Sequence, residues 1–173
     1  MIIRPLDKKD IDTYDNLCLR FGTIFNSSAW LRIFNDVQIF GIYDESGTLA
    51  GGFHLFSRKL AFFSVIRDAP FTPTTGPFYD DSNVTKHNYR LNLEKKIISA
   101  LSEFLTRRKM SVISLSLSRS VIDTQPFFWQ NFKVIAQYTY RIPLAPTEEE
   151  IWESFSRKKR QNIKKVELDF LTI

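Results

Sequence analysis

The sequence predicts an α/β (α+β) domain in which helices flank a mixed, largely antiparallel sheet. Residues 37–43 and 48–56 alternate around a tight turn and predict a hairpin, and residues 60–66 predict a further strand. Residues 85–109 carry an apolar stripe at helical spacing. Strict alternation at residues 112–118 then predicts a strand that returns to the sheet in a βαβ crossover. The length of 173 residues suits one domain.

The N-terminal elements follow from short local signals. Residues 2–6 predict a first strand. Asp10 can cap a helix with apolar residues at helical spacing, and Gly22 can end it. Ser27 or Ser28 can cap a shorter helix that follows. In the hairpin turn, Gly47 supplies the positive φ that such turns need.

Regular structure fails over residues 68–83, which hold three prolines and a glycine. Loops of this length in compact domains are functional or disordered, and the interleaved aromatic residues favour a functional, ordered loop. We expect Phe71 and Phe78 to pack on the sheet and to hold it. Its threonine hydroxyls, and the close backbone approach that glycine permits, make it a candidate ligand surface. The alternative is a rigid loop that covers the end of the sheet.

The C-terminal part predicts a short helix at residues 123–131, a strand at 138–142 and one long helix after 147. Thr147 and Glu150 form a capping-box pattern at the start of that helix. On a helical wheel, one apolar stripe that includes Trp152 and Phe155 predicts the buried face, and Lys159 falls in the middle of that stripe. Such a polar notch indicates either a break in the helix or a site.

The positive charge is local. The chain has a formal net charge of +5, and residues 157–165 hold six lysines and arginines without an acid, so the rest sums to 5 − 6 = −1. A patch this small favours an anionic group such as a phosphate, a carboxylate or an RNA backbone. The alternative is a solvated helix face.

Several other chemistries are disfavoured. The single cysteine, Cys18, excludes an internal disulfide, and the N-terminus shows no signal-peptide pattern. No apolar run approaches the roughly 18 residues of a membrane span, so a cytoplasmic protein is expected. The two histidines and one cysteine show no zinc spacing, and no glycine-rich nucleotide loop is present. His54 could serve as a general base, or it could be a hydrogen-bonded structural histidine.

Five strings together with this element order resemble a known family. They are SAWL at 28–31, GIYD through GGF at 41–53, PFTPTTGP at 70–77, YTYRIPL at 138–144, and IW through RKKRQNI at 151–163. The chain resembles the GNAT-like half-domain of the FemAB/FemX acyltransferases over essentially its whole length. Members of that family form amide bonds by acyl transfer, the best known of them from aminoacyl-tRNA to peptidoglycan precursors.

The resemblance implies that residues 1–173 form one GNAT-like half-domain, the N-terminal half of two. Residues 147–173 would then be an inter-domain helix and the start of the missing second half. That second GNAT-like half-domain is an expected partner of this chain. Ordinary GNAT enzymes hold coenzyme A on a glycine-rich turn before a helix. No glycine directly precedes the long helix here, and residues 80–85 place two carboxylates there. We therefore expect no cofactor in this half, and an acyl donor (aminoacyl-tRNA or acyl-CoA) in the complete protein.

Under this interpretation, loop 70–79 and the basic helix 157–165 line one side of an acceptor cleft for an anionic small molecule or cell-envelope precursor. No catalytic residue is assigned. The candidate substrate-binding residues are Trp30, Thr74, Gly76, Pro77, Arg157, Lys159, Arg160 and Asn162.

Two other functions stay open. The chain could be a nucleic-acid module that binds tRNA through residues 157–165. It could also be a non-catalytic interaction domain that presents its apolar, strand-like tail at 168–173 to a partner. In the acyltransferase interpretation, the chain is expected to self-associate through that tail or to leave its last residues loosely attached. In the acyltransferase interpretation, the chain alone is expected to show no turnover.

Overall fold

The computed structural model describes residues 1–139, 143 and 145–170, with the side chains of Leu60 and of 167–170 left aside. The chain divides into two compact units, Met1–Val134 and Ile135–Ile173, and each is treated by itself. In the described part of the chain, no helix is long and apolar enough to cross a membrane.

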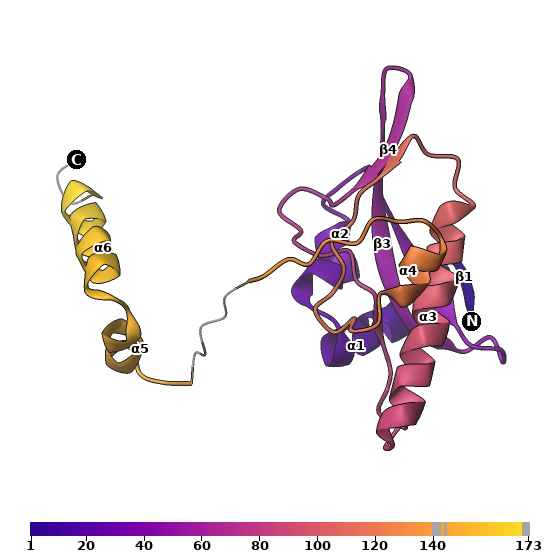
Figure 1. The fold of residues 1–173 in the computed structure, drawn as a ribbon, viewed down its shortest axis with the longest axis horizontal. Coiled ribbons are helices and arrows are strands. Elements are labelled where there is room, and N and C mark those ends of the chain that lie inside the picture. The colour runs from indigo at the N-terminus through magenta and orange to yellow at the C-terminus, as the bar shows by residue number, and fades with distance from the viewer. Residues whose placement is uncertain (140–142, 144, 171–173) are drawn as a thin grey trace. The chain divides into compact units, whose positions relative to one another are not determined.

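The first unit contains the sheet and most of the helices (Figure 1). Its elements in chain order are β1 (Ile2–Pro5), η1 (Lys8–Asp10), α1 (Ile11–Phe21), η2 (Ile24–Asn26), α2 (Ser28–Leu31), β2 (Val37–Tyr43), β3 (Leu49–Leu60), β4 (Phe63–Arg67), β5 (Phe78–Tyr79), α3 (His87–Thr106), β6 (Val112–Ile113) and α4 (Gln125–Trp129).

The sheet has the strand order β1-β2-β3-β4-β6, and β5 pairs with β3 off this path. All pairs are antiparallel except β4 with β6, which is parallel. The predicted mixed, largely antiparallel sheet is therefore confirmed, together with the parallel return after the long helix. The backbone hydrogen bonds of β6 continue past its two residues, since Thr75 N donates to Ser116 O and Ser118 N donates to Gly76 O.

Two apolar clusters lie on opposite faces of the sheet. One joins Phe40 and Phe53 of the sheet to the buried side of α3, which includes Ile97 and Leu101. The other surrounds Tyr14 of α1 and consists of Tyr14, Leu17, Cys18, Tyr43, Leu49 and Phe78. Because successive strand residues point to opposite faces, this two-sided burial follows from the alternation in β2 and β3.

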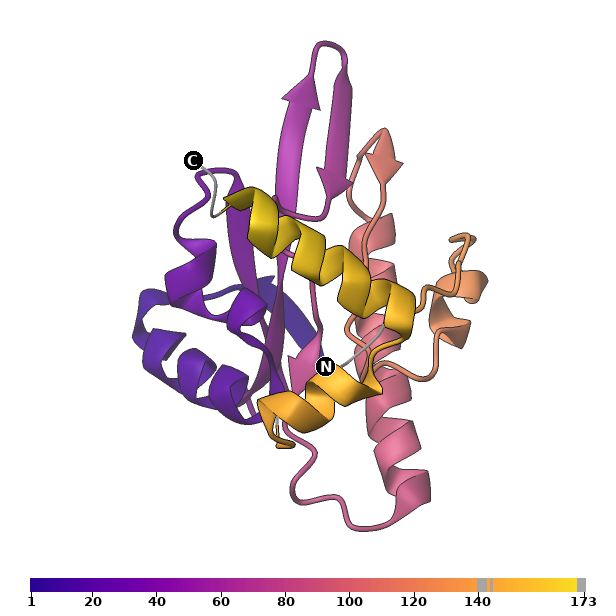
Figure 2. The same cartoon turned by 90° about the vertical axis from the view of Figure 1, so that its left-hand side faces the viewer.

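One edge of β3 is shared by two short strands. Gly51 and Gly52 pair with β5, and β3 pairs with β4 from Phe56 onward. Between β4 and β5 the chain leaves the sheet at Asp68 and returns at Pro77. Figures 1 and 2 show that the β3–β4 hairpin extends past the helices of this unit.

The second unit contains two helices in place of the single predicted helix. α5 (Glu148–Ser154) begins at Thr147 with the predicted capping box and ends at Phe155, whose ψ is 142°. α6 (Arg157–Phe170) then starts, with Ser156 Oγ accepting a hydrogen bond from Lys159 N. The polar notch is therefore a break, and the placement of Lys159 in an apolar stripe is wrong because the two helices do not share one wheel.

Two further strand predictions concern this unit. Residues 138 and 139 have no regular structure, and 140–142 lie outside the described residues. Residues 168–170 continue α6, so the strand-like tail is wrong there, while 171–173 lie outside the description.

Candidate functional site

The interruption between β4 and β5 is held by a carboxylate that takes the place of a backbone carbonyl. Before it, Ser114 N donates to Ile66 O at 2.9 Å. At the interruption, Asp68 Oδ1 accepts from Ser116 N at 2.9 Å and from Thr75 Oγ1 at 3.1 Å. The Ser116 amide therefore keeps a partner while residues 69–74 leave the sheet.

The inner side of the loop is anchored by buried hydrogen bonds. Asn26 Nδ2 and His54 N both donate to Thr75 O, at 3.2 and 3.3 Å. Tyr14 OH in turn donates to Asn26 O at 2.8 Å. These bonds connect the loop to η2, β3 and α1, so the predicted ordered loop is confirmed.

The outer side of the loop is tied to an aromatic group on α2. Trp30 Nε1 donates to Thr72 Oγ1 at 2.9 Å, and Thr72 Oγ1 donates to Pro70 O at 3.0 Å. Phe25 and Phe34 contact the Trp30 ring edge-on, with centroids 5.6 and 6.0 Å away. The side chain of Trp30 is half-buried, so one part of it faces solvent.

Phe71 does not hold the loop, contrary to expectation. Its side chain is 87% exposed and its φ is 55°, whereas Phe78 is buried in the core as predicted. A bulky residue at positive φ is rare, and such residues concentrate at functional sites. With Ile24 and Ile33, which are also exposed, Phe71 leaves apolar surface on both segments that carry the Trp30–Thr72 bond.

The predicted loop residues fall into two groups. Thr74 is partly exposed. Gly76 and Pro77 are buried, and Gly76 has a φ of 114°. A Cβ on Gly76 would lie 3.1 Å from Phe53 Cβ, which explains the glycine there.

His54 lies on β3 under this loop and is fully buried. Among the residues that the structure describes, neither ring nitrogen has a hydrogen-bond partner, so the expectation of a hydrogen-bonded structural histidine is wrong. Burial lowers the pKa of His54 to about 4, and the nearby Asp68 carboxylate offsets only part of that effect. The imidazole is neutral at pH 7, and it is too weak a base and too deeply buried to reach a substrate from this position.

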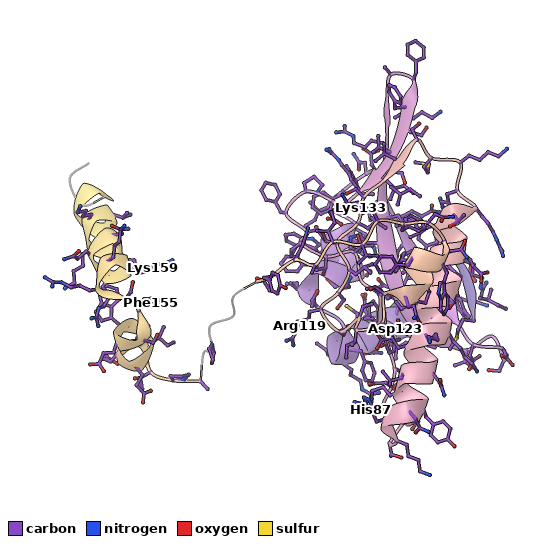
Figure 3. All side chains as sticks on the ribbon, in the orientation of Figure 1. His87, Arg119, Asp123, Lys133, Phe155 and Lys159 are labelled. Carbon is purple, nitrogen blue, oxygen red and sulfur yellow. The ribbon has the colours of Figure 1, made fainter. Side chains whose placement is uncertain are left out.

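The basic segment forms an exposed face on α6. Its cations are Arg157, Lys158, Lys159, Arg160, Lys164 and Lys165. Among the residues that the structure describes, none of these cations forms an ion pair with a carboxylate. Figure 3 labels Lys159 on α6 and Phe155 at the break before it.

A shallow concavity of about 280 Å³ lies within the second unit. It is lined by Trp152, Arg157, Arg160, Gln161 and Lys164. Lys164 Nζ lies 5.9 Å from the centre of the Trp152 ring. Two of the predicted residues, Arg157 and Arg160, therefore share one hollow, and Lys159 and Asn162 are exposed outside its lining. Sequence reasoning assigned Trp152 to the core because a continuous helix would have buried it.

The start of α3 offers little to an anion. Asp80 Oδ1 accepts from both the amide and the hydroxyl of Ser82, and Asp81 pairs with Arg90 at 3.1 Å. No glycine lies between these carboxylates and His87, where the helix begins. Elsewhere in the described ranges, no group of three or more His, Cys, Asp or Glu side chains is placed to hold a metal ion.

No protein-family model matches the chain, and no curated protein matches it. Among solved structures, it is similar to a ribosomal-protein-alanine N-acetyltransferase from Brucella melitensis biovar Abortus 2308, with 15% identity, a TM-score of 0.48, and 83% of this chain and 98% of that one covered. It is also similar to a probable acetyltransferase, with 13% identity, a TM-score of 0.47 and coverage of 85% and 100%. For an acetyltransferase from Trypanosoma brucei, the identity is 15% and the TM-score is 0.47, with 83% of this chain and 99% of that one covered. The fold itself is the mixed, largely antiparallel sheet flanked by helices that the sequence predicts.

Proposed function

We propose that this chain belongs to a GNAT-type acyltransferase of FemAB-like specificity, which transfers an acyl or aminoacyl group to an amine of a cell-envelope precursor. The observation that carries the proposal is the ordered interruption at Asp68–Pro77. The loop and α2 carry an aromatic rim, which consists of the exposed Phe71 and the half-buried Trp30. In the sheet, the antiparallel strands β2, β3 and β4 are followed by the parallel strand β6. The element order around it is the one that the sequence resemblance implies.

In this proposal, Trp30 and the loop contact the acceptor. The half-buried indole is fixed by the bond to Thr72, and Phe71 and Ile33 supply apolar surface next to it. Such a rim suits a ligand with both apolar and polar parts, because rigid aromatic side chains give contact area at low entropic cost. Gly76 and Pro77 are buried, and they contribute by fixing the shape of the loop.

The acyl donor is assigned to no residue of the first unit. Attack by the acceptor amine on the acyl carbon forms the amide bond, the bond from that carbon to tRNA or coenzyme A breaks, and the amine loses a proton. The reaction therefore needs a base and a donor site. His54 is buried and weakly basic, and the start of α3 carries carboxylates. We therefore propose that a second half-domain completes the site, and we expect no turnover by these 173 residues alone.

A ligand screen tests the assignment. Thermal unfolding is measured with nucleotide-linked sugars, acyl-CoA and aminoacyl-tRNA as probes. We expect a nucleotide-linked sugar to raise the melting temperature and acyl-CoA to leave it unchanged. Trp30→Leu should reduce the affinity for that sugar about tenfold or more, as loss of an aromatic anchor does. The matched control is Trp129→Leu, at a 59% exposed tryptophan on α4.

Two results contradict the proposal. One is stabilisation by acyl-CoA with transfer by the purified chain, which would make it a self-sufficient enzyme. The other is equal loss of sugar binding in both tryptophan variants, which would place the ligand away from the loop.

A second candidate function is tRNA binding through α6. The observation that favours it is the group of six cations on α6, without a carboxylate partner in the described part of the chain, beside the half-buried Trp152. Five of these cations are exposed, and Arg160 is half-buried. An RNA phosphate and a stacked base fit such a combination.

A further inference from the structure

The β3–β4 hairpin carries an exposed aromatic tip that neither the sheet nor the proposed acceptor site uses. β3 pairs with β2 up to Phe56 and then continues to Leu60 with only β4 beside it. The last backbone hydrogen bond from β3 to the β2 side is Ser57 N to Asp36 O at 3.1 Å. The end of the hairpin therefore projects beyond the sheet, as Figures 1 and 2 show.

The residues at the tip of the hairpin are not the residue types that a tight turn favours. Leu60 pairs with Phe63, so Ala61 and Phe62 form a two-residue turn. Ala61 has a φ of 52°, where glycine or asparagine is the usual residue. Phe62 is 98% exposed and Phe63 is 62% exposed. A turn that departs from local preference and exposes two aromatic rings points to a function of those rings.

Cations lie along the hairpin, from Lys59 near the tip to Arg67 at the sheet end. No acid occurs between Glu45 and Asp68, and within that stretch Arg58, Lys59 and Arg67 are exposed. The segment after α3 adds more, because Ser111 N donates to Ser64 O at 2.8 Å and Ser64 N donates to Ser111 Oγ at 3.2 Å. These bonds bring the segment around Lys109 to the side of the hairpin, whereas Arg108 stacks on the Phe40 and Phe104 rings of the core.

The acids that face this group neutralise only part of it. Asp36 pairs with Arg58 at 3.3 Å, and Glu103 pairs with Arg107 at 3.2 Å. Lys59, Arg67 and Lys109 have no carboxylate partner among the residues described. The hairpin surface is thus a projecting pair of phenylalanines with an uncompensated positive rim.

We propose that this hairpin docks the protein on an anionic lipid bilayer, with Phe62 and Phe63 entering the headgroup region and the basic rim contacting lipid phosphates. A bilayer fits better than a protein partner because the apolar part is a narrow tip, not a face. Aromatic rings favour the membrane interface, and basic residues near it are attracted to anionic headgroups. The proposal is independent of acyl transfer.

Vesicle co-sedimentation of the full chain tests it. The probes are vesicles of equimolar phosphatidylcholine and phosphatidylglycerol, and vesicles of phosphatidylcholine alone. We expect binding to the anionic vesicles that weakens with added salt, and about tenfold less binding for the double variant Phe62→Ser, Phe63→Ser. The matched control is Leu19→Ser, at an 86% exposed leucine on α1, which should bind as the unaltered chain does.

Charge variants separate the hairpin from α6. Lys59→Gln with Lys109→Gln should weaken vesicle binding, whereas Lys8→Gln with Lys9→Gln, at exposed lysines of η1, should not. Three results overturn the proposal. The first is no binding to anionic vesicles. The second is binding that survives the loss of both phenylalanines but is lost when Lys158, Lys159, Lys164 and Lys165 are changed to Gln. The third is self-association of the chain that the Phe62→Ser, Phe63→Ser variant abolishes.

Discussion

His54 shows how one residue can report on the burial of the loop above it. Within the described residues, its two ring nitrogens are the only buried side-chain polar atoms without a partner. An imidazole in that position is stable only while neutral, because a buried charge without a partner is costly. The sequence identified His54 as a candidate, since it is one of two histidines, but the alternation of β3 alone does not reveal what covers that face.

The folded protein should lose stability as this histidine becomes protonated in the unfolded chain. The pKa of His54 is about 4 in the folded state, below its unfolded value of about 6.5, so the unfolded state binds the proton first as pH falls. Between those values the free energy of unfolding should fall with falling pH, by about 2 kcal/mol from pH 7 to pH 5. Urea unfolding at both pH values measures this loss.

The variant His54→Leu should unfold with a clearly smaller difference between the two pH values. His87→Gln, at the exposed start of α3, is the matched control and should retain the full difference. An unchanged pH dependence in His54→Leu would mean that the imidazole is solvated or paired in solution.

At the scale of elements, Glu94 joins α3 to the segment after β6. Its buried carboxylate accepts hydrogen bonds from Ile122 N, from Asp123 N at 2.7 Å and from Tyr79 OH at 3.2 Å. The helix stripe did not predict this, because a glutamate at a helix position is ordinarily exposed.

Glu94→Leu should lower the free energy of unfolding by about 3 kcal/mol, because it leaves two amides and a hydroxyl without their partner. The control on the same helix is Glu103→Leu, which removes only an exposed pair with Arg107 and should cost at most about 0.5 kcal/mol. Urea unfolding compares the two. Equal losses would mean that water replaces the carboxylate at residues 122 and 123.

The elements differ in how far the sequence could predict them. The β2–β3 hairpin and the parallel return of β6 follow from alternation, from Gly47 and from the helix between the strands. The interruption at Asp68 could be recognised as a loop by its prolines. Its support could not, because a carboxylate that replaces a backbone carbonyl has no periodic signal.

A break in the C-terminal helix was one of the two alternatives that the polar notch left open, but the apolar pattern did not place it at Ser156. The wheel assumed a continuous helix from 147, and it therefore placed Lys159 and Trp152 on one buried face. Serine is a preferred N-cap residue, and Ser156 caps α6 by accepting from Lys159 N at 3.3 Å. The local capping signal competed with the apolar periodicity, and the structure follows the cap.

At the scale of the molecule, the charge distribution separates the two candidate functions. The nine residues 157–165 hold six cations, and the rest of the chain sums to −1. A protein with a generally basic surface would bind polyanions through many regions. Here α6 holds the densest group of cations, so changing its lysines is a sharp test of tRNA binding.

If α6 binds tRNA, the logarithm of the association constant should fall linearly with the logarithm of the salt concentration. Full engagement of six cations gives a slope of about −5 on duplex RNA, because each neutralised phosphate contributes about −0.9. Changing Lys158, Lys159, Lys164 and Lys165 to Gln should make the slope shallower by about 3 to 4, whereas Lys8→Gln with Lys9→Gln should leave it unchanged. Fluorescence anisotropy with labelled tRNA at several salt concentrations measures both. A slope near zero, or one that the α6 variant does not alter, would remove tRNA binding by this helix and leave its concavity to a small anion.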